Sequence, residues 1–288
     1  MLQPPHRVQL LPHWAGEPAD AMIALHARRS AASIAAWRQA RPAAPLVVVL
    51  TGTDLYRDID ASADAQRSLR LADRLVVLQP LGVQRLPAAL RGKAVAIVQS
   101  SPALAPWPKP RRHLRALMAG HLRAEKDPGT YFAAARLLND RRDIRLDHVG
   151  AALDPGFAAA ARATMAACPR YRWLGMQTHA QTRRRLRAAH LLVHPSVLEG
   201  GAQVVIEAVI AGTPVLASRI DGNLGLLGDG YDGCFAPGDA AALAAMLRRC
   251  RDEPAMLAHL QDQCAARAPL FTPARERAAL LALMETFG

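Results

Sequence analysis

The chain has 288 residues, of which 51% are hydrophobic, and a formal net charge of +12. This length allows one large domain or two medium domains with an ample core. The sequence has no run of 18 apolar residues, and its first residues show no charged-then-apolar signal pattern, so a membrane span and secretion are not expected. The cysteines lack metal-like spacing, which favours reduced thiols in a cytoplasmic protein. They are Cys168, Cys234, Cys250 and Cys264.

The positive charge is only weak evidence for nucleic-acid binding. Of the 36 basic residues, 33 are arginine, and alanine is abundant throughout, which indicates a compositional bias rather than one basic patch. The densest cluster is Arg183-Arg184-Arg185 with Arg187. A solvated helix face is the first explanation for it, a basic cleft for anionic substrates the second, and nucleic-acid binding the third. We therefore expect no nucleic-acid partner.

Strands and helices alternate through the first third of the chain. The run LVVVL at 46–50 is apolar on both faces, as in a buried parallel strand. The other predicted strands are 8–11, 21–25, 75–78 and 94–98, and the predicted helices are 30–40, 63–72 and one near Leu86. The stretch 99–112 follows, with four prolines and no periodicity, and is the best candidate for a linker.

The same alternation resumes after the linker. Predicted strands are 115–119, 144–149, 171–174, 191–193 and 215–217. Predicted helices are 128–139, 156–167, 178–189, 202–211 and 240–250, with helical material to the end. Asp127 is a plausible N-cap, with Pro128 at the first helical position. The pattern predicts an α/β protein of two doubly wound Rossmann-like domains, 1–98 and 113–288, facing a cleft. The terminal helices could pack back on the first domain.

One segment, 194–218, combines a strand end, a glycine turn, a helix and a second strand. Gly200 and Gly201 stand just ahead of the helix, where backbone N–H groups attract phosphate and small residues let a ligand come close. Two carboxylates, Glu199 and Glu207, are separated by seven residues. An ordinary strand-to-helix loop would explain the glycines alone.

The whole string resembles the E-x7-E segment of retaining glycosyltransferases with the GT-B fold, which use nucleotide-sugar donors. The resemblance implies that Glu199 contacts the donor sugar and that the turn amides of Gly200, Gly201 and Ala202 hold the diphosphate. It implies that Glu207 takes the ribose hydroxyls. It also implies a UDP-sugar as co-substrate, with no metal and no other cofactor.

A second segment, GHLRAEK at 120–126, resembles the family's G-R-L-x-x-x-K motif, which grips the donor diphosphate. Lys126 matches it, whereas His121 stands where arginine is usual and Arg123 is the alternative source of charge. Cations there would stabilise the leaving nucleotide. Surface charges on a loop are the other interpretation, mainly for Arg123. Three further donor contacts are expected at loops that follow strands: Gly175, Ser196 and Asn223.

The first domain should hold the acceptor. Two groups of residues follow its strands: His26, Arg28, Arg29 and Ser30, and Thr51, Gly52, Thr53 and Asp54. The family usually has His-Gly where this chain has Thr51-Gly52, which argues against a common sugar acceptor. Adjacent arginines indicate an anionic acceptor, because guanidinium groups match phosphate oxygens. A charged helix start explains the arginines equally well.

Five stretches together show a narrower resemblance, to the selenosugar synthases of selenoneine biosynthesis. They are ALHARRSAASI, LTGTDLYRDI, GHLRAEKDP, EGGAQVVIEA and ASRIDGNLGLLG. The resemblance implies that selenophosphate displaces UDP from a UDP-sugar such as UDP-N-acetylglucosamine, and that the phosphoryl group is then lost to leave a selenosugar.

Other functions remain open at this stage. They are a glycosyltransferase with a hydroxyl acceptor, a UDP-sugar epimerase-like enzyme and a non-catalytic UDP-binding pseudoenzyme. Members of the fold begin with a strand and a Gly-rich loop that cover the donor phosphates, and we expect the first domain to lack both. The sequence does not fix the oligomeric state, the donor sugar or the anomeric outcome.

Overall fold

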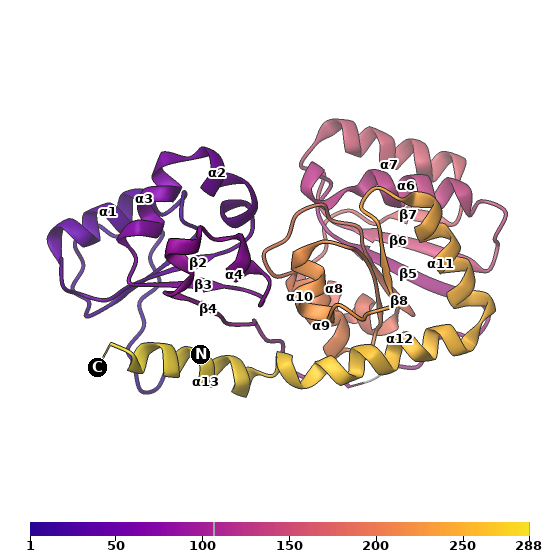
Figure 1. Cartoon of the computed structure of the whole chain (residues 1–288). Coiled ribbons are helices and arrows are strands. Elements are labelled where there is room, and N and C mark those ends of the chain that lie inside the picture. Colours follow the sequence, from indigo (N-terminus) through magenta and orange to yellow (C-terminus); the bar gives the residue numbers. More distant parts are fainter. Residues whose placement is uncertain (106, 288) are drawn as a thin grey trace. The chain divides into compact units, whose positions relative to one another are not determined.

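The computed structural model describes residues 1–105 and 107–287. These form two compact units, each with its own parallel sheet (Figure 1). The first unit comprises Met1–Ser100, Leu198–Gly201 and Thr272–Gly288. The second comprises Ser101–Val197 and Ala202–Phe271.

The first unit has four parallel strands in the order β1-β2-β3-β4. They are β1 (Met22–Leu25), β2 (Leu46–Leu50), β3 (Arg74–Val77) and β4 (Ala94–Ala96). The helices are α1 (Ala31–Ala40), α2 (Ile59–Ala61), α3 (Ala63–Leu71), α4 (Gly82–Arg85), α5 (Ala88–Arg91) and α13 (Pro273–Glu285). A π-helical turn, Asp54–Asp58, leads into α2.

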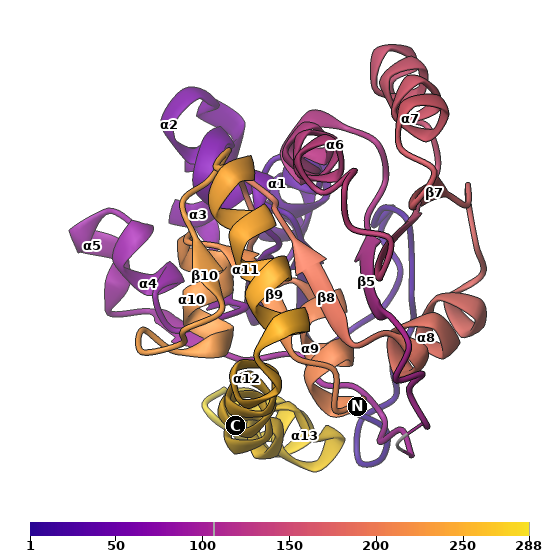
Figure 2. The same cartoon turned by 90° about the vertical axis from the view of Figure 1, so that its right-hand side faces the viewer.

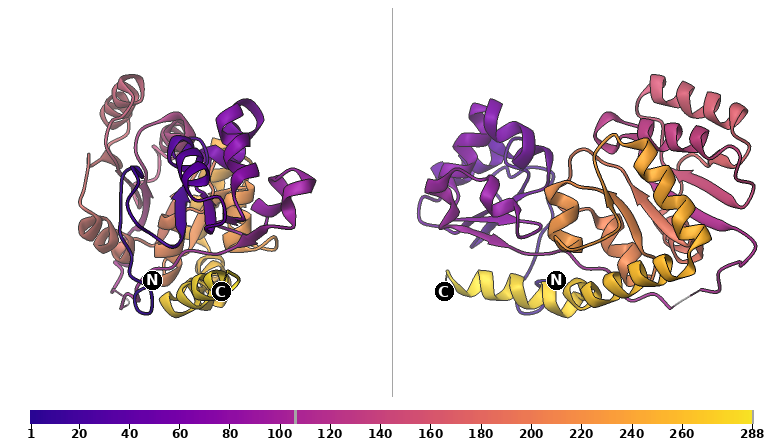
Figure 3. Two further views of the ribbon diagram at one scale, coloured as in Figure 1. Left: turned by 90° about the vertical axis from the view of Figure 1, so that its left-hand side faces the viewer. Right: turned by 45° about the vertical axis from the view of Figure 1, so that its right-hand side comes forward.

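Both faces of β2 are buried, as its sequence predicts. Val48 and Leu50 join the core that includes Trp37 of α1. On the opposite face, Val47 packs in a smaller cluster with Leu283 of α13. The C-terminal helix therefore closes the second face of the first sheet, and Figure 3 shows it in yellow alongside that sheet.

The second unit has six parallel strands in the order β10-β9-β8-β5-β6-β7. They are β5 (Leu114–Ala119), β6 (Ile144–Val149), β7 (Tyr171–Trp173), β8 (Leu191–His194), β9 (Val215–Ser218) and β10 (Cys234–Phe235). The helices are α6 (Pro128–Leu137), α7 (Pro155–Ala167), α8 (His179–Ala188), α9 (Gln203–Ile210), α10 (Asp221–Leu227), α11 (Ala240–Asp252) and α12 (Pro254–Arg267). Two 3-10 turns, Ala124–Lys126 and Ala268–Phe271, complete it.

Helices cover both faces of this second sheet. Figure 2 shows α6 and α7 on one side of it and α8 and α9 on the other. On the α6 side, Tyr131, Phe132, Tyr171 and His148 form an aromatic cluster with ring centroids 5.6–6.4 Å apart. Such ring pairs contribute packing energy beyond the burial of their area.

Most predicted elements are confirmed within a residue or two, including the N-cap at Asp127, whose carboxylate accepts from the Thr130 N–H. The strand predicted at 8–11 is wrong: these residues adopt no regular structure, and Leu10 is 91% exposed. Alternating apolar residues form a strand only where a sheet edge takes up their backbone hydrogen bonds. The helix predicted near Leu86 is two short helices, because Pro87 interrupts it.

Three elements were missed: α2 with its π-helical turn, α10, and β10. All are short, with two to seven residues each, and too brief for a periodic pattern to reveal.

All four cysteines are free thiols. Among the described helices, none is both long and apolar enough to cross a bilayer.

His148 makes the second unit sensitive to acid. Its buried ring bonds to the Tyr171 hydroxyl and the Gly120 carbonyl at 3.0 Å each, and burial lowers its pKa to about 4. Between the ordinary histidine value near 6.5 and that value, the unfolded chain binds a proton that the folded chain does not. The free energy of unfolding should therefore fall as the pH drops through this window.

We expect His148→Gln to flatten this pH dependence by roughly 1 kcal/mol per pH unit between pH 6 and 4.5. The glutamine amide can still donate to the Gly120 carbonyl but does not titrate. Urea unfolding at several pH values measures the slope, with the exposed His6→Gln as the control. An unchanged slope in the His148 variant would contradict the assignment.

Candidate functional site

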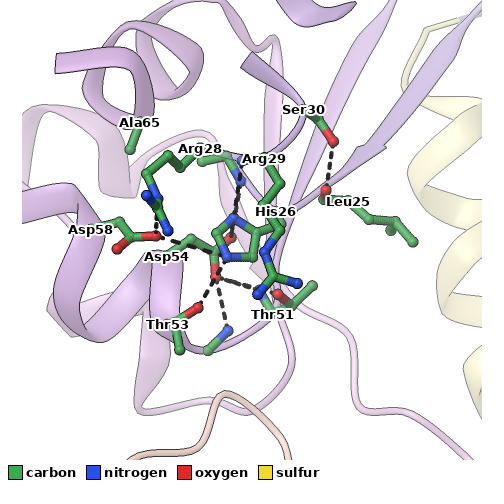
Figure 4. Close-up of polar contacts among 12 residues, drawn as sticks. Leu25, His26, Arg28, Arg29, Ser30, Thr51, Thr53, Asp54, Asp58 and Ala65 are labelled. Atoms are coloured by element: carbon green, nitrogen blue, oxygen red, sulfur yellow. Dashed lines mark hydrogen bonds and ion pairs between the residues drawn. The ribbon is translucent and has the colours of Figure 1, made fainter. Parts of the chain in front are cut away.

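In the first unit, the carboxylate of Asp54 ties together the chain after β1 and the chain after β2. It accepts backbone N–H groups from Ala27 at 3.0 Å, Thr51 at 2.8 Å and Gly52 at 2.9 Å. Asp54 is fully buried, and these bonds compensate for the loss of water. The two strand ends predicted to form the acceptor site are therefore adjacent (Figure 4).

His26 lies beside this carboxylate in a left-handed backbone conformation, with φ +72°. Its Nδ1 accepts the Arg29 N–H at 3.3 Å, so the proton is on Nε2, which lies 3.0 Å from the Thr53 hydroxyl. Burial lowers the pKa of His26, although Asp54 acts in the opposite direction. The ring is thus a neutral hydrogen-bond donor at neutral pH, rather than a base with a free acceptor nitrogen.

The two adjacent arginines differ in their surroundings. Arg28 forms an ion pair with Asp58 at 2.8 Å, and that carboxylate is buried. The Arg29 guanidinium makes no hydrogen bond or ion pair with any residue that the structure describes. Of the two arginines, Arg29 is therefore the one whose positive charge is not compensated by a described carboxylate. The Ser30 hydroxyl donates to the Leu25 carbonyl and so stabilises the turn.

Asp58 was not among the predicted site residues. It lies in the π-helical turn after Asp54, where it pairs with Arg28 and comes within 3.8 Å of the His26 ring. Its sequence neighbours gave no sign of this, because the contact spans 30 residues.

The second unit assembles the GHLRAEK segment at the end of β5. The His148 ring donates to the Gly120 carbonyl, and the stem of Lys126 lies over Gly120, since a Cβ added there would be 3.5 Å from its Cγ and Cδ. The His121 ring bonds to the backbone of the protein itself, because its Nδ1 accepts the Ala151 N–H at 3.0 Å.

The charges in this loop come from Lys126 and Arg123. Burial lowers the pKa of His121, and Arg123 and Lys126 lower it further, so its ring is neutral at neutral pH. His121 therefore cannot supply the positive charge that an arginine would. Arg123 lies 4.0 Å from Glu125, an ion pair whose members are partly exposed and whose attraction is weak.

A buried network joins the ends of β8 and β9 to α10. His194 Nδ1 donates to Asn223 Oδ1 at 3.0 Å, and His194 Nε2 lies 3.2 Å from the Ser196 hydroxyl. The Asn223 amide donates to Ser218, whose hydroxyl donates to the Ser196 carbonyl. Ser196 and Asn223, both predicted donor contacts, thus hold the loops in place, while His194 and Ser218 were not predicted.

Glu207 is 4% exposed within α9, and His179 covers its carboxylate. The His179 Nε2 lies 2.5 Å from Glu207 Oε1, although the His179 side chain is itself 72% exposed. The carboxylate is therefore buried, and its partner His179 is exposed to solvent. Sequence reasoning missed His179, which lies 28 residues before its partner.

The remaining predicted residues form turns. Glu199, Gly200 and Gly201 group with the first unit. A Cβ on Gly200 would lie 2.6 Å from the carbonyl of Thr51, so close backbone packing excludes any larger residue there. Gly175 has a left-handed backbone with φ +68°, and Ala202 is the N-cap of α9. Among the described residues, no group of three or more His, Cys, Asp or Glu side chains could hold a metal.

Comparisons with known proteins agree with this geometry. Residues 113–253 match the family model described as glycosyl transferases group 1. A D-inositol 3-phosphate glycosyltransferase of Streptomyces avermitilis is 35% identical over 176 residues, 56% of this chain and 37% of that protein. The same enzyme of Streptomyces coelicolor is also 35% identical over 176 residues, with 56% and 38% covered. The match thus spans little more than a third of these relatives.

Solved structures extend the likeness to nearly the whole chain. The Anabaena protein HepE in complex with UDP-glucose has a TM-score of 0.77 at 15% identity, with 93% of this chain and 79% of that one covered. The α,α-trehalose 6-phosphate synthase of Burkholderia multivorans has a TM-score of 0.76 at 12% identity, with 96% and 72% covered. At such identities the likeness shows the fold, which is the GT-B fold of two Rossmann-like domains. The match to the glycosyl transferases group 1 model covers residues 113–253, just under half of the chain.

Proposed function

We propose that the protein is a glycosyltransferase that uses a UDP-sugar donor. The family match over residues 113–253 supports this most directly, since that stretch contains both predicted donor segments. The fold it shares with HepE, crystallised with UDP-glucose, supports the choice of nucleotide. The proposal includes no metal and no further cofactor.

The donor roles follow from charge and position. Glu207 of α9 would accept the ribose hydroxyls, its buried carboxylate having the exposed His179 as its partner. Lys126 and Arg123 would face the diphosphate, where negative charge grows as UDP departs. Glu199 would contact the donor sugar, and the amides of the turn before α9 would hold the phosphates.

The acceptor is proposed to be selenophosphate. A hydroxyl acceptor needs a base to share its proton, and the neutral His26 already uses Nδ1 to accept the Arg29 N–H. A selenophosphate anion needs no such base. Arg29 has a charge not compensated by any described carboxylate. Its backbone N–H bonds to the His26 ring, which in turn lies 3.0 Å from the Thr53 hydroxyl (Figure 4). This combination favours anion capture over hydroxyl activation.

The proposed chemistry has two steps. Selenium attacks the anomeric carbon of the donor while the bond from that carbon to UDP breaks, and its electron pair leaves with UDP. Water then cleaves the selenium–phosphorus bond and releases phosphate, which leaves the selenosugar. The product would serve selenoneine biosynthesis.

Product analysis tests this proposal against its alternatives. With UDP-N-acetylglucosamine and selenophosphate, mass spectrometry should detect UDP, phosphate and a selenosugar, and the rate should not change with a metal chelator. Release of UDP or a C2 epimer without acceptor would instead indicate an epimerase-like enzyme. Faster turnover with a neutral sugar alcohol would indicate a hydroxyl acceptor, and UDP binding without any product a pseudoenzyme.

Donor binding depends on Glu207 in this proposal. Glu207→Ala should weaken UDP binding by about 1.5–3 kcal/mol, because the ribose hydroxyls lose a charged acceptor. Calorimetry measures the affinity, and circular dichroism confirms that the variant is folded. Glu285→Ala, at the exposed end of α13, is the matched control and should bind UDP like the wild type. Equal affinity in the Glu207 variant would refute the assignment.

Acceptor binding should depend more on Arg29 than on Arg28. Arg29→Ala should raise the acceptor KM about tenfold or more, the loss expected for one charge-assisted contact, with UDP affinity unchanged. Arg28→Ala should have a smaller effect, because Asp58 already compensates that charge. Arg67→Ala, on the exposed side of α3, is the control.

His26→Asn completes the series, because asparagine tolerates the left-handed backbone at this position. It should reduce kcat less than the roughly 10²–10⁴-fold typical of a lost general base. Wild-type acceptor kinetics in both arginine variants would overturn the proposed anion site.

A further inference from the structure

The second unit has a recess that two arginines of the basic cluster on α8 help to line. Its volume is about 340 Å³, within the range of small-molecule sites. It is formed by β5, β6, the turn before α8, and α8 itself. The polar residues that line it are Arg115, Asp147, Gln177, Gln181, Arg184 and Arg185.

The charges in this recess do not cancel. Asp147 is buried, and its carboxylate accepts two hydrogen bonds from the Arg172 guanidinium, at 2.8 and 3.0 Å. Arg115, Arg184 and Arg185 form no ion pair with any carboxylate that the structure describes. Three positive groups therefore line one cavity without an ion pair among the described residues, an arrangement that raises the local concentration of anions.

The hydrogen-bonding groups are also left incomplete. The Nε of Arg115 is buried without a partner in the described structure. Gln181 uses its side-chain oxygen to accept the Thr178 N–H in the capping box, and Gln177 uses its amide nitrogen to donate to the Leu174 carbonyl. The Gln181 amide nitrogen can thus donate to a ligand, and the Gln177 side-chain oxygen can accept from one. A buried donor without a partner is uncommon in proteins, and a ligand oxygen would satisfy it.

The recess is distinct from the candidate donor segment. Arg115 is the second residue of β5, whereas Gly120 follows its last residue, so the two are separated by about 16 Å of extended strand. Leu117 and Asp147, opposite each other in the sheet, lie on the α8 side. His148, which holds the Gly120 turn, packs on the other side with Phe132 of α6.

The geometry points to a second anion-binding site here, for a small phosphorylated molecule that also has hydroxyl groups. Arg115, Arg184 and Arg185 bind its phosphate, because guanidinium groups donate paired hydrogen bonds to phosphate oxygens. Asp147, Gln177 and Gln181 bind its hydroxyls. This site does not depend on the proposed acceptor, and its lining includes none of the residues proposed to bind UDP.

Calorimetry with glucose 6-phosphate, inorganic phosphate and glucose as probes tests the site. Glucose 6-phosphate should bind most tightly, inorganic phosphate more weakly, and glucose not at all. The double variant Arg184→Ala/Arg185→Ala should weaken binding of glucose 6-phosphate about tenfold or more. Arg184 is exposed and Arg185 only half-buried, and alanine favours a helix, so the variant should keep its helix content by circular dichroism.

The controls separate this site from general charge and from the donor segment. Arg142→Ala/Arg162→Ala removes the same charge from exposed positions outside the recess and should leave binding unchanged. Lys126→Ala should also leave it unchanged. No binding by the wild type at ~5 mM probe would overturn the inference. So would equal weakening in the control double variant, or a loss confined to Lys126→Ala.

Discussion

The buried Asp54 carboxylate is the contact on which the first unit depends. Two parallel strands end side by side, and the turns that follow leave N–H groups at Ala27, Thr51 and Gly52 without strand partners. One carboxylate accepts all three, which fixes the path of both turns. The left-handed His26 and the orientation of Arg29 follow from that path. Asp54 therefore shapes the candidate acceptor site, although its own oxygens are already engaged.

In the second unit, histidine side chains bond the strand-end loops in the same way. His148 joins the Gly120 turn to Tyr171, and His194 joins Ser196 to Asn223. Each imidazole has two ring nitrogens, so it bridges a carbonyl or amide oxygen and a hydroxyl. Both units thus build their strand-end loops from buried polar side chains. Such loops are rigid enough to hold a ligand only while every buried group keeps its partner.

Patterns of neighbouring residues predicted the helices and strands. Contacts between residues far apart in the sequence could not be predicted, and these form much of the candidate site. The LVVVL strand and the cap at Asp127 depend on adjacent residues, so both could be read directly. The Arg28–Asp58 and His179–Glu207 pairs join residues 30 and 28 positions apart, and no periodicity signals them. The sequence predicts that Gly200 lets a ligand come close, and that contact stays a prediction. The observed neighbour of Gly200 is the Thr51 backbone, which the same steric argument could not distinguish from a ligand.

The histidine at position 121 determines how positive charge is distributed in the candidate donor loop, residues 120–126. A guanidinium would bring a permanent positive charge, whereas His121 is neutral at neutral pH because burial and its two cationic neighbours lower its pKa. Its Nδ1 is also committed to the Ala151 N–H. The loop therefore has two cations rather than three, and one of them, Arg123, is only loosely held by Glu125. Because exposed ion pairs of this kind are weak, Arg123 can leave Glu125 for a diphosphate at little cost. The substitution that removes one charge from the loop thus leaves a second one available at a neighbouring position.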